Sequence, residues 1–442
     1  MSMQVPRDKS LDSTFALMRE GYLFIKNRVE RYQSDVFRTR LLLTDMICIS
    51  GEEAARLFYD RALFQRHGAV LKRVQDTLMG VDAIQTMDGE AHLHRKQLFM
   101  SLMSPPRQQR LTQLCQEEWQ SSLGRWQGAE RVVLLDEATR VLCRAACRWA
   151  GIPVREAEAN ERAKDFISMV EAFGAVGPRH WRGRRARVRT ELWIRQIIED
   201  VRSGKLRVDE ESALHAIAFY RQPDGNPMTT QMAAEELINV VRPTVAVAIF
   251  ITFAALALHE YPEYRSELQS GDEPYLELFA QEVRRYYPFA PFLGAKVRKD
   301  FVWQRCDFKK GTLVLLDVYG TNHDSRLWEY PNEFRPERFK DWKDGAFSFI
   351  PQGGGDPAEG HRCPGEGITV HAIEASVDFL VNEVDFDVPA QDLSYSLMSM
   401  PTLPKSGFIM SNVRQRQRRQ AIESDAAVGG RAAVSGKSAP RT

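Results

Sequence analysis

Several patterns that identify common protein classes are missing from this 442-residue chain. Its formal net charge is only +1, so the whole molecule has no bias toward nucleic acid or acidic membranes. The N-terminal stretch MSMQVPRDKS lacks the apolar segment of a secretory signal. The longest apolar run, 245–258, is too short to span a bilayer. We therefore expect a soluble cytoplasmic protein with no membrane span and no nucleic-acid partner.

Cysteine pairs of the kind that bind zinc are also missing. The chain has six cysteines, and none of them forms a C-x-x-C pair, which argues against a zinc ribbon. Cys143 and Cys147 would share a helical face, but no second pair completes a metal-ligand set. We interpret both as buried apolar thiols.

Helical patterns dominate the sequence between about 50 and 290. A strand is expected at 41–49, and Ser50 with Glu53 resembles a capping box that opens the next helix. Two short strands around a Lys-Lys-Gly turn are expected within 301–318, and a long helix from Gly367. The clearest helical segments lie near 106–126, 135–150, 155–173, 184–203 and 228–260.

The domain organisation follows from these elements and from the lack of an internal repeat. With no linker before Asn412, residues 1–412 are predicted to form one mainly α domain with minor β structure. After Asn412 the sequence becomes arginine-rich and then rich in Ala, Gly and Ser. We predict that 413–442 form a disordered basic tail.

The first chemical signal is the stretch FSFIPQGGGDPAEGHRCPGEG, residues 347–367. Three successive glycines could cradle a phosphate, but no Gly-Lys-Ser/Thr follows them. Instead, Cys363 comes just before the predicted last helix, where the helix dipole and nearby amide N–H groups favour a thiolate. Such a thiolate can ligate haem iron.

This stretch resembles the cysteine-ligand loop of the cytochromes P-450. Glu282-x-x-Arg285 matches the E-x-x-R motif of that family, and the stretch PERF, with Arg338, matches its P-E-R-F segment. The resemblance covers about 1–412 and implies the cytochrome P-450 fold with haem b (iron protoporphyrin IX). It also implies that Cys363 is the axial ligand of the iron, and that the glutamate and the two arginines are structural. The chain departs from the family at Asp356, where a phenylalanine is usual.

Arg242 and Pro243 stand where a small residue pair usually lies over the haem in that family. The acid and threonine usual in oxygen activation would fall at Val245 and Ala246, which cannot deliver a proton. A buried cation without a partner costs several kcal/mol, and no acid lies within one turn on its face. A buried carboxylate of the protein would be the ordinary partner. Because Pro243 removes the N–H that would bond the carbonyl of Asn239, we expect a kink in the helix. We interpret Arg242, next to this kink, as a binding site for a ligand carboxylate.

The Arg-Pro pair also resembles a smaller branch, the bacterial fatty-acid peroxygenases, which include hydroxylases and decarboxylases. The resemblance implies hydroxylation of long-chain fatty acids at the β and/or α carbon with hydrogen peroxide and no obligatory reductase. Arg242 would hold the substrate carboxylate, which then acts as the acid–base catalyst, and Pro243 would shape the space beside it. Gln85 would face the substrate and suggests hydroxylation, with some decarboxylation to terminal alkenes left open. An ordinary polar loop residue is the other interpretation of Gln85.

The resemblance also implies residues that hold the haem and the acyl tail. His92 and Lys96, on one helical face, and His361 are candidates for contacts with the haem propionates. Candidates for the apolar channel, for which plain core packing is the alternative, are Met79, Val170, Phe173, Phe289 and Phe292.

The densest basic run, GPRHWRGRRARVR at 177–189, carries six arginines. Nucleic-acid binding is one interpretation, and a solvated helix face is another. In the implied fold this run would lie near the channel mouth, where it could guide anionic fatty acids.

Two other functions are compatible with the same motifs. One is a conventional haem monooxygenase that receives electrons from a reductase. The other is a non-catalytic haem-thiolate sensor or carrier. Turnover with peroxide alone would separate the peroxygenase from both.

Overall fold

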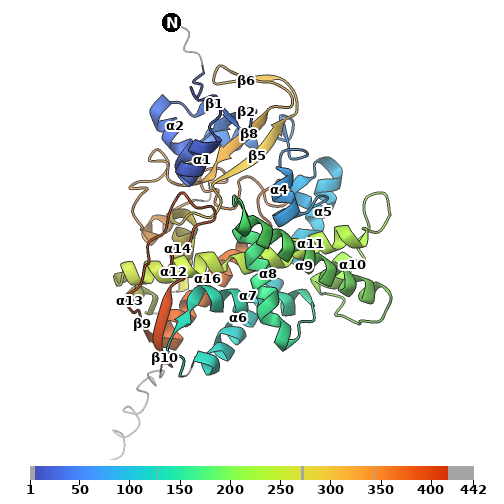
Figure 1. Ribbon diagram of the computed structural model, residues 1–442, viewed down its shortest axis with the longest axis vertical. Coiled ribbons are helices and arrows are strands. Elements are labelled where there is room, and N and C mark those ends of the chain that lie inside the picture. Colours follow the sequence, from blue (N-terminus) through green and yellow to red (C-terminus); the bar gives the residue numbers. More distant parts are fainter. Residues whose placement is uncertain (1–4, 127, 270–272, 344, 417–442) are drawn as a thin grey trace, which may run out of the picture.

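Helices form most of the molecule, and a smaller sheet region lies at one end of it (Figure 1). The computed structural model describes residues 5–126, 128–269, 273–343 and 345–416. The α-helices are α1 (Thr14–Glu20), α2 (Phe24–Tyr32), α3 (Glu52–Phe58), α4 (Lys72–Val74), α5 (Gly89–Leu102), α6 (Pro105–Trp126), α7 (Leu134–Ala150), α8 (Glu156–Glu171), α9 (Pro178–Arg202), α10 (Ala213–Ala218), α11 (Thr230–Ala246), α12 (Ala248–Glu260), α13 (Glu263–Gln269), α14 (Glu273–Tyr286), α15 (Val318–Asn322) and α16 (Glu366–Asp378). Short 3₁₀ or π turns are η1 (Gly21–Leu23), η2 (Gln75–Met79), η3 (Ile84–Thr86), η4 (Pro336–Phe339) and η5 (Phe379–Glu383).

The central helices of the core are α11 and α12. Every residue of α12 from Ala248 to Leu258 is buried, as expected for a helix that is apolar on all sides. Within the described residues, 230–260 is the one helical stretch long and apolar enough to cross a membrane, and 94% of its most apolar window is buried inside the protein. It therefore serves as the core helix of the fold.

The main sheet has the strand order β1-β2-β8-β5-β3. Its strands β2 and β8 pair in parallel, and β5 pairs with β8 in antiparallel. The strands are β1 (Val36–Leu41), β2 (Thr44–Ile49), β3 (Phe64–Gln65), β4 (Val132–Val133), β5 (Phe292–Val297), β6 (Phe301–Trp303), β7 (Cys306–Phe308), β8 (Leu313–Asp317), β9 (Val384–Asp387) and β10 (Ile409–Gln415). The prediction of a mainly α fold with minor β structure is confirmed.

Local predictions near the sheet need correction. The strand expected at 41–49 is instead the second half of a hairpin, because Leu42 and Leu43 form a turn with positive φ between β1 and β2. The capping box is wrong. Gly51 is the N-cap of α3, and the Ser50 hydroxyl donates to Asp317 instead, at 3.2 Å.

Three other boundaries also differ from the sequence predictions. The hairpin β6–β7 turns at 304–305, before the Lys-Lys-Gly sequence that leads into β8. The helix predicted over 228–260 continues through Pro243 and is divided at Val247 into α11 and α12. Strand β10 continues to Gln415, beyond the predicted boundary at 412, because it pairs with β9. The rest of the predicted tail, 417–442, lies outside the described residues.

The E-x-x-R motif forms the predicted buried cluster. Arg285 makes two contacts with Glu282, at 2.7 and 2.8 Å, and Arg338 Nε lies 3.2 Å from Glu282 Oε1. The remaining donors of Arg285 bond the backbone carbonyls of Asn322, Pro331 and Glu333. This cluster fixes α14 against the segment that leads to the cysteine loop.

Candidate active site

Cys363 lies at the entry to α16, on a loop tied to α14. Its N–H donates to the carbonyl of Gln352 at 3.0 Å, and Arg284 of α14 donates to the Gln352 amide oxygen at 3.2 Å. Burial raises the pKa of Cys363, while the Gly365 N–H, Lys96 and Gln352 lower it. Burial and the N–H groups at the start of α16 thus act on this thiol in opposite directions.

The three glycines before the cysteine serve the backbone and not a phosphate. Gly353 has φ +99°, and a Cβ there would come within 2.7 Å of the Tyr59 hydroxyl oxygen and 3.3 Å of Arg362 Cα. Only glycine fits such a turn without strain. Asp356, exposed in the same loop, accepts a hydrogen bond from the Ala358 N–H at 2.7 Å.

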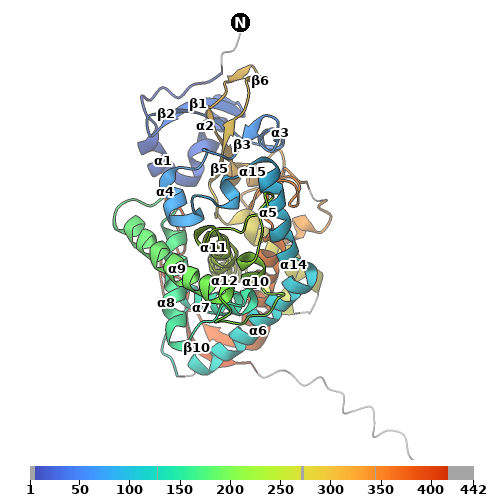
Figure 2. The same cartoon turned by 90° about the vertical axis from the view of Figure 1, so that its right-hand side faces the viewer.

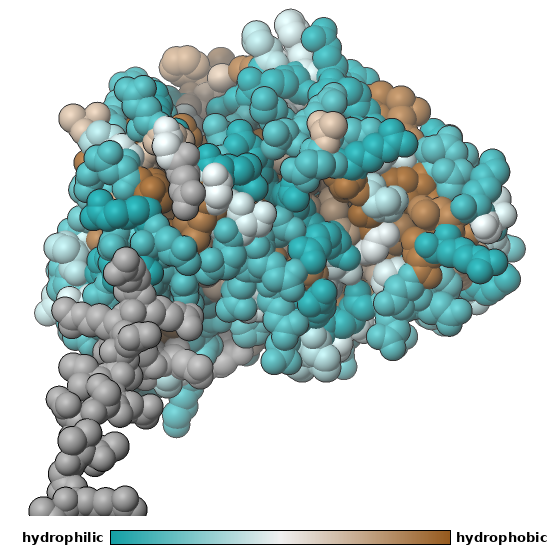
Figure 3. All heavy atoms as spheres, turned by 90° about the horizontal axis from the view of Figure 1, so that it is seen from below, coloured by the Kyte–Doolittle hydropathy of each residue, from teal (hydrophilic) through white to brown (hydrophobic). Residues whose placement is uncertain are grey.

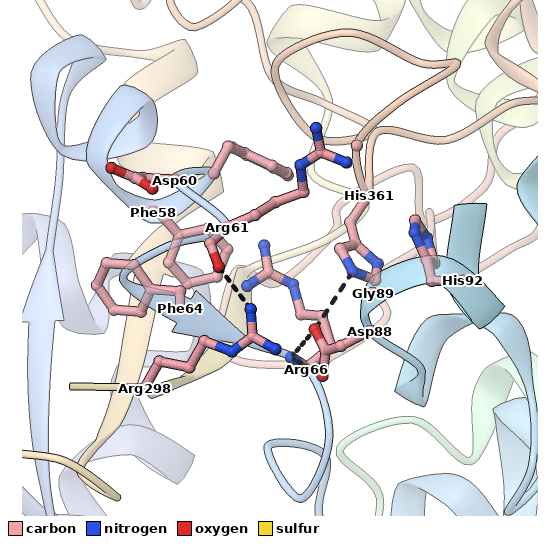
Figure 4. A pocket seen from close by; sticks show the side chains of 12 residues that line it. Phe58, Asp60, Arg61, Phe64, Arg66, Asp88, Gly89, His92, Arg298 and His361 are labelled. Atoms are coloured by element: carbon pink, nitrogen blue, oxygen red, sulfur yellow. Dashed lines mark hydrogen bonds and ion pairs between the residues drawn. The ribbon is translucent and has the colours of Figure 1, made fainter.

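A cationic cavity of about 210 Å³ lies beside this loop (Figure 4). The rings of His92 and His361 stack at 4.0 Å, and His361 Nε2 lies 3.9 Å from Asp88 Oδ1. The cavity is lined by Phe58, Tyr59, Asp60, Arg61, Phe64, Arg66, Asp88, Gly89, His92, Arg298, Gly360 and His361. The structure therefore brings together two of the predicted haem-binding residues on the side of the loop facing α5.

Burial sets the charge state of the basic residues at this cavity. It lowers the pKa of His92 to about 4 and lowers that of His361 as well, so both imidazoles are neutral at pH 7 and offer N–H donors. Burial lowers the pKa of Lys96 to about 8, although Cys363 and Asp356 raise it. Lys96 Nζ donates to the Arg362 carbonyl at 2.6 Å, which links α5 to the cysteine loop.

Arg66 is a cavity residue that the sequence motifs did not reveal. It is buried, and its guanidinium lies over the rings of Phe58 and Tyr59, at 4.2 and 5.4 Å from their centroids. Within the part of the chain that the structure describes, its guanidinium forms no ion pair. A sulfur ligand next to a set of buried donors and an unpaired cation fits an iron porphyrin, whose propionates need such partners. The chemistry of these residues therefore fits haem.

Arg242 projects from α11 and has no carboxylate partner among the residues that the structure describes. The residue is 7% exposed, and its Nη2 donates to Asn239 Oδ1 at 3.2 Å. Its Nε is buried and has no partner among the described residues. Burial and Arg187 lower the pKa of Arg242 to about 9, while Cys363 raises it. The structure thus has a buried cation with an unused donor on α11.

A chain of buried polar groups extends from Arg242 to α5. Asn239 Nδ2 donates to the Met79 carbonyl at 2.9 Å and lies 3.4 Å from Gln85 Oε1. Glu236, fully buried, accepts from Arg95 Nη1 and from the Ile84 N–H, each at 2.9 Å. This chain holds the segment that carries two of the predicted substrate contacts.

Sequence reasoning missed Glu236, Asn239 and Arg95 as partners of this chain. A signal was present, because 236, 239 and 242 are polar positions three residues apart in the mostly apolar second half of the helix. Burial raises the pKa of Glu236 to about 7, whereas Arg95 lowers it. The carboxyl group nearest to Arg242 in sequence is therefore committed to another arginine.

The predicted channel residues do not all pack together. Val170 and Phe289 contact the main helical core, where Phe289 stacks on Phe250 with ring centroids 4.7 Å apart. Phe292 packs against a separate cluster that includes Phe24 and Phe37. The other two candidates, Met79 and Phe173, are half-buried.

The arginine run forms the first half of α9, and most of it is engaged by neighbours. Arg182 pairs with Glu171, Arg189 with Asp165, and Arg187 with Glu191. Arg179 donates to the Met400 carbonyl at 3.3 Å. The remaining two, Arg184 and Arg185, are exposed.

Comparison with curated proteins finds only partial matches. Residues 263–409 match the family model described as Cytochrome P450. The chain is 36% identical to (+)-menthofuran synthase of Mentha piperita over 142 residues, 31% of this chain and 27% of that protein. It is 26% identical to ent-isokaurene C2/C3-hydroxylase of Oryza sativa subsp. japonica, over 49% of this chain and 47% of that protein. The chain thus spans less than half the length of these curated relatives.

Solved structures match over nearly the whole chain. Cytochrome P450EX alpha (CYP152N1), solved with myristic acid, has a TM-score of 0.91 and 42% identity, covering 94% of this chain and 100% of that one. Variants of cytochrome P450SP alpha (CYP152B1) reach 0.90 and 43% over 92% of this chain and 100% of theirs. A variant of cytochrome P450 OleT in complex with arachidonic acid reaches 0.91 and 38% over 94% and 100%. With the cysteine loop, the E-x-x-R cluster and Arg242 in place, the chain belongs to the cytochrome P450 family, in its branch of fatty-acid peroxygenases.

Proposed function

We propose that this protein is a cytoplasmic, hydrogen-peroxide-dependent hydroxylase of long-chain fatty acids that acts at the β and/or α carbon. The observation that carries the proposal is the buried guanidinium of Arg242, whose one side-chain partner in the described residues is an amide oxygen. A fatty-acid carboxylate completes this site by bidentate hydrogen bonding. Related structures solved with myristic and arachidonic acid support this choice of ligand.

Cys363 would hold haem b through its iron, with Arg66, His92, Lys96 and His361 as candidate propionate partners, and the bound group would supply the iron at which peroxide is activated. The protein side of the site offers no proton donor at Val245 or Ala246, both apolar and buried. The carboxylate held by Arg242 is then the group that transfers the proton between the peroxide oxygens. General acid–base catalysis of this kind contributes about 10²–10⁴-fold to a rate.

Asn239 has the role of a positioning residue in this proposal. Its Oδ1 accepts from Arg242, so its Nδ2 must face Gln85 and the Met79 carbonyl. The hydrogen bond from Arg242 to Asn239 orients the guanidinium. The hydrogen bond from Asn239 occupies Gln85 Oε1, so Gln85 Nε2 remains available to donate toward the substrate. A head group fixed in this way restricts which carbons can reach the iron.

The acyl tail extends from Arg242 along Met79, Val170, Phe173 and Phe289 in this proposal. Pro243, half-buried next to Arg242, shapes the space between the guanidinium and the haem.

Product analysis tests the function directly. Purified haem-loaded protein is given hydrogen peroxide and myristic acid without any reductase, and the products are identified by mass spectrometry. We expect 2- or 3-hydroxymyristic acid. Products formed only with NADPH and a reductase would instead indicate a conventional monooxygenase. No product under either condition, with an intact thiolate–CO spectrum, would indicate a sensor or carrier.

A further inference from the structure

Two helices on the surface carry large apolar side chains that point into solvent. At α1 these are Phe15 and Met18, which are 75% and 51% exposed, and Leu11, 91% exposed, lies in the segment just before the helix. The spacing of three residues puts Phe15 and Met18 on one helical face. An amphipathic helix normally turns such a face toward the core, so these side chains are arranged against the usual pattern.

Helix α9 repeats this arrangement in its first half. Trp181, Val188 and Leu192 are 60%, 51% and 60% exposed, and their spacing of seven and four residues also defines one stripe. Val176, just before the helix, is 55% exposed. Both helices therefore present an apolar stripe that nothing in the described chain covers.

The two stripes belong to one side of the molecule. Figure 2 shows α1, α4 and the beginning of α9 along the same edge. The segment 397–400 connects them, because the Tyr22 N–H donates to the Leu397 carbonyl at 2.9 Å and Arg179 donates to the Met400 carbonyl. Met398 in this segment is 53% exposed. We refer to the exposed apolar side chains of α1, of 397–400 and of 176–192 as the α1–α9 face.

Such a concentration is not general on this protein. Seen from below, the surface is mostly hydrophilic, with apolar side chains in separate patches (Figure 3). Val302 and Phe219, which are 66% and 48% exposed, belong to other elements. Single exposed apolar residues are normal on a protein, whereas a gathered set marks an interaction site.

The segment that carries most of the stripe on α9 is rich in arginine, with Glu171 and Glu191 at its two ends. Between 172 and 190 the chain has six arginines and no acidic residue. Acids outside that segment pair with three of them, and Arg184 and Arg185 stay exposed. An apolar stripe flanked by arginine is the pattern of a helix that lies on an anionic lipid surface.

A second copy of the chain fits this face less well. A symmetric dimer places the same patch of each subunit opposite itself. Arg184 and Arg185 would then face their own copies across a buried interface, and like charges in that arrangement oppose association.

Hydrogen bonds join the α9 part of this face to segments that carry two of the predicted channel residues. Arg73 of α4 bonds the Ala175 carbonyl, and Arg187 of α9 donates to the carbonyl of Leu78 at 2.9 Å. The channel candidates Phe173 and Met79 are therefore adjacent in sequence to the residues that join α4, η2 and α9. Resting on the proposed function, we propose that the α1–α9 face docks onto anionic lipid bilayers, and that the fatty acid is loaded from the bilayer surface.

Vesicle binding tests this proposal with the full-length holoprotein. The probe is a large unilamellar vesicle of equimolar phosphatidylcholine and phosphatidylglycerol, compared with pure phosphatidylcholine, in a sedimentation assay. We expect salt-sensitive binding to the anionic vesicles. Binding should fall at least about tenfold in the double variant Phe15→Asp/Trp181→Asp, because both apolar anchors then carry a charge that the surface repels. The matched control, Val302→Asp/Phe219→Asp, should bind like the wild type.

Three results would overturn the docking proposal. One is wild-type protein that stays in the supernatant with anionic vesicles, and another is equal binding by the two double variants. The third is a dimer, seen in analytical ultracentrifugation, that is lost in the Phe15→Asp/Trp181→Asp variant. Peroxide-driven oxidation of myristic acid, added without vesicles, is measured in parallel. Because that substrate needs no vesicle, its failure counts against the proposed function, whereas its success with no vesicle binding counts against docking alone.

Discussion

Two buried arginines of this protein differ in how fully their donors are used. Arg285 is 1% exposed and bonds both oxygens of Glu282 and three backbone carbonyls. Arg242 is 7% exposed, bonds only the amide oxygen of Asn239, and leaves its Nε without a partner in the described residues. Both residues are buried arginines, and they differ in how many of their N–H donors have a partner. In the proposed function, this difference separates a structural arginine from one that binds a ligand.

The difference has an energetic consequence. A paired and hydrogen-bonded buried charge stabilises the fold around it, whereas an unpaired one costs free energy of folding. Burial lowers the pKa of Arg242 to about 9, which reflects this cost. A ligand carboxylate offsets the cost when it binds, so fatty acid should stabilise the native state by mass action.

Removing the unsatisfied arginine should have the largest effect on catalysis. In Arg242→Ala, peroxide-driven hydroxylation of myristic acid should fall by about 10²–10⁴-fold, because the substrate carboxylate loses its anchor. The melting temperature should not fall, since the change removes an unpaired buried charge. Turnover and thermal unfolding are measured on the same haem-loaded samples. Wild-type turnover in this variant would remove Arg242 from the proposed mechanism.

Removing the acid of the saturated cluster should act on stability instead. Glu282→Gln leaves Arg285 and Arg338 buried without a carboxylate, and breaking such a pair costs about 3–5 kcal/mol. Urea unfolding measures the loss. The control is Glu333→Gln, whose contact with Arg335 is 3.8 Å long between exposed side chains and contributes less than about 1 kcal/mol. Equal free energies of unfolding for the two variants would contradict a structural role for the buried Glu282 ion pairs.

The part of the site set by local sequence could be predicted. Cys363 before a helix, the pairing of Glu282 with Arg285, and the lack of a nearby acid for Arg242 depend on short spacings along one helix or one loop. The place of Arg338 in the cluster, 56 residues from Glu282, follows only from the family resemblance. The long apolar helix also identified the core. Positions of this kind need only the helical or turn geometry of a few neighbouring residues.

Residues that meet only through tertiary packing could not be predicted. Arg66 reaches the cavity from the loop after β3, and Arg95 meets Glu236 from 141 residues away. The predicted cap at Ser50 is wrong for the same reason, because the Ser50 hydroxyl donates a hydrogen bond to Asp317 of β8. Long-range partners of this kind override local preferences that are worth about 1 kcal/mol.

A substitution at Asn239 can give Arg242 a buried acid partner, as Arg285 has in Glu282. Asn239→Asp places a carboxylate where the amide oxygen now lies 3.2 Å from Arg242. The guanidinium then has an acid partner, and the substrate carboxylate must compete with it. We expect fatty-acid affinity to weaken at least about tenfold, and by less in Asn239→Ala, which loses one hydrogen bond to a charged group. The change in haem spin state on adding myristic acid gives the dissociation constant without turnover, and tighter binding by the aspartate variant would contradict the assignment.

Alkaline pH should weaken substrate capture because Arg242 titrates early. Its pKa is lowered to about 9, so kcat/KM, which reports the free enzyme, should fall as pH rises through about 9. The same titration has the opposite effect on the free energy of unfolding. The folded state releases this proton near pH 9, whereas the unfolded arginine keeps it to about pH 12.5, so this group's contribution to the free energy of unfolding rises between those values. A pH profile of kcat/KM that stays flat to pH 10 would contradict the early titration of Arg242.

The smallest effect is expected at exposed arginines, where solvent screens the charge. Arg184→Gln/Arg185→Gln should lower kcat/KM for myristic acid by a few-fold at low salt and by nothing measurable at high salt, because steering of an anion is screened beyond about 10 Å at 0.1 M ionic strength. Lys309→Gln/Lys310→Gln removes the same charge from the turn before β8 and should leave kcat/KM unchanged. A loss that persists at high salt would mean that Arg184 or Arg185 contacts the bound substrate. The helix α9 would then contain an arginine that binds the ligand, like Arg242. The exposure of an arginine would then not be enough to tell whether it attracts the fatty acid from a distance or contacts it directly.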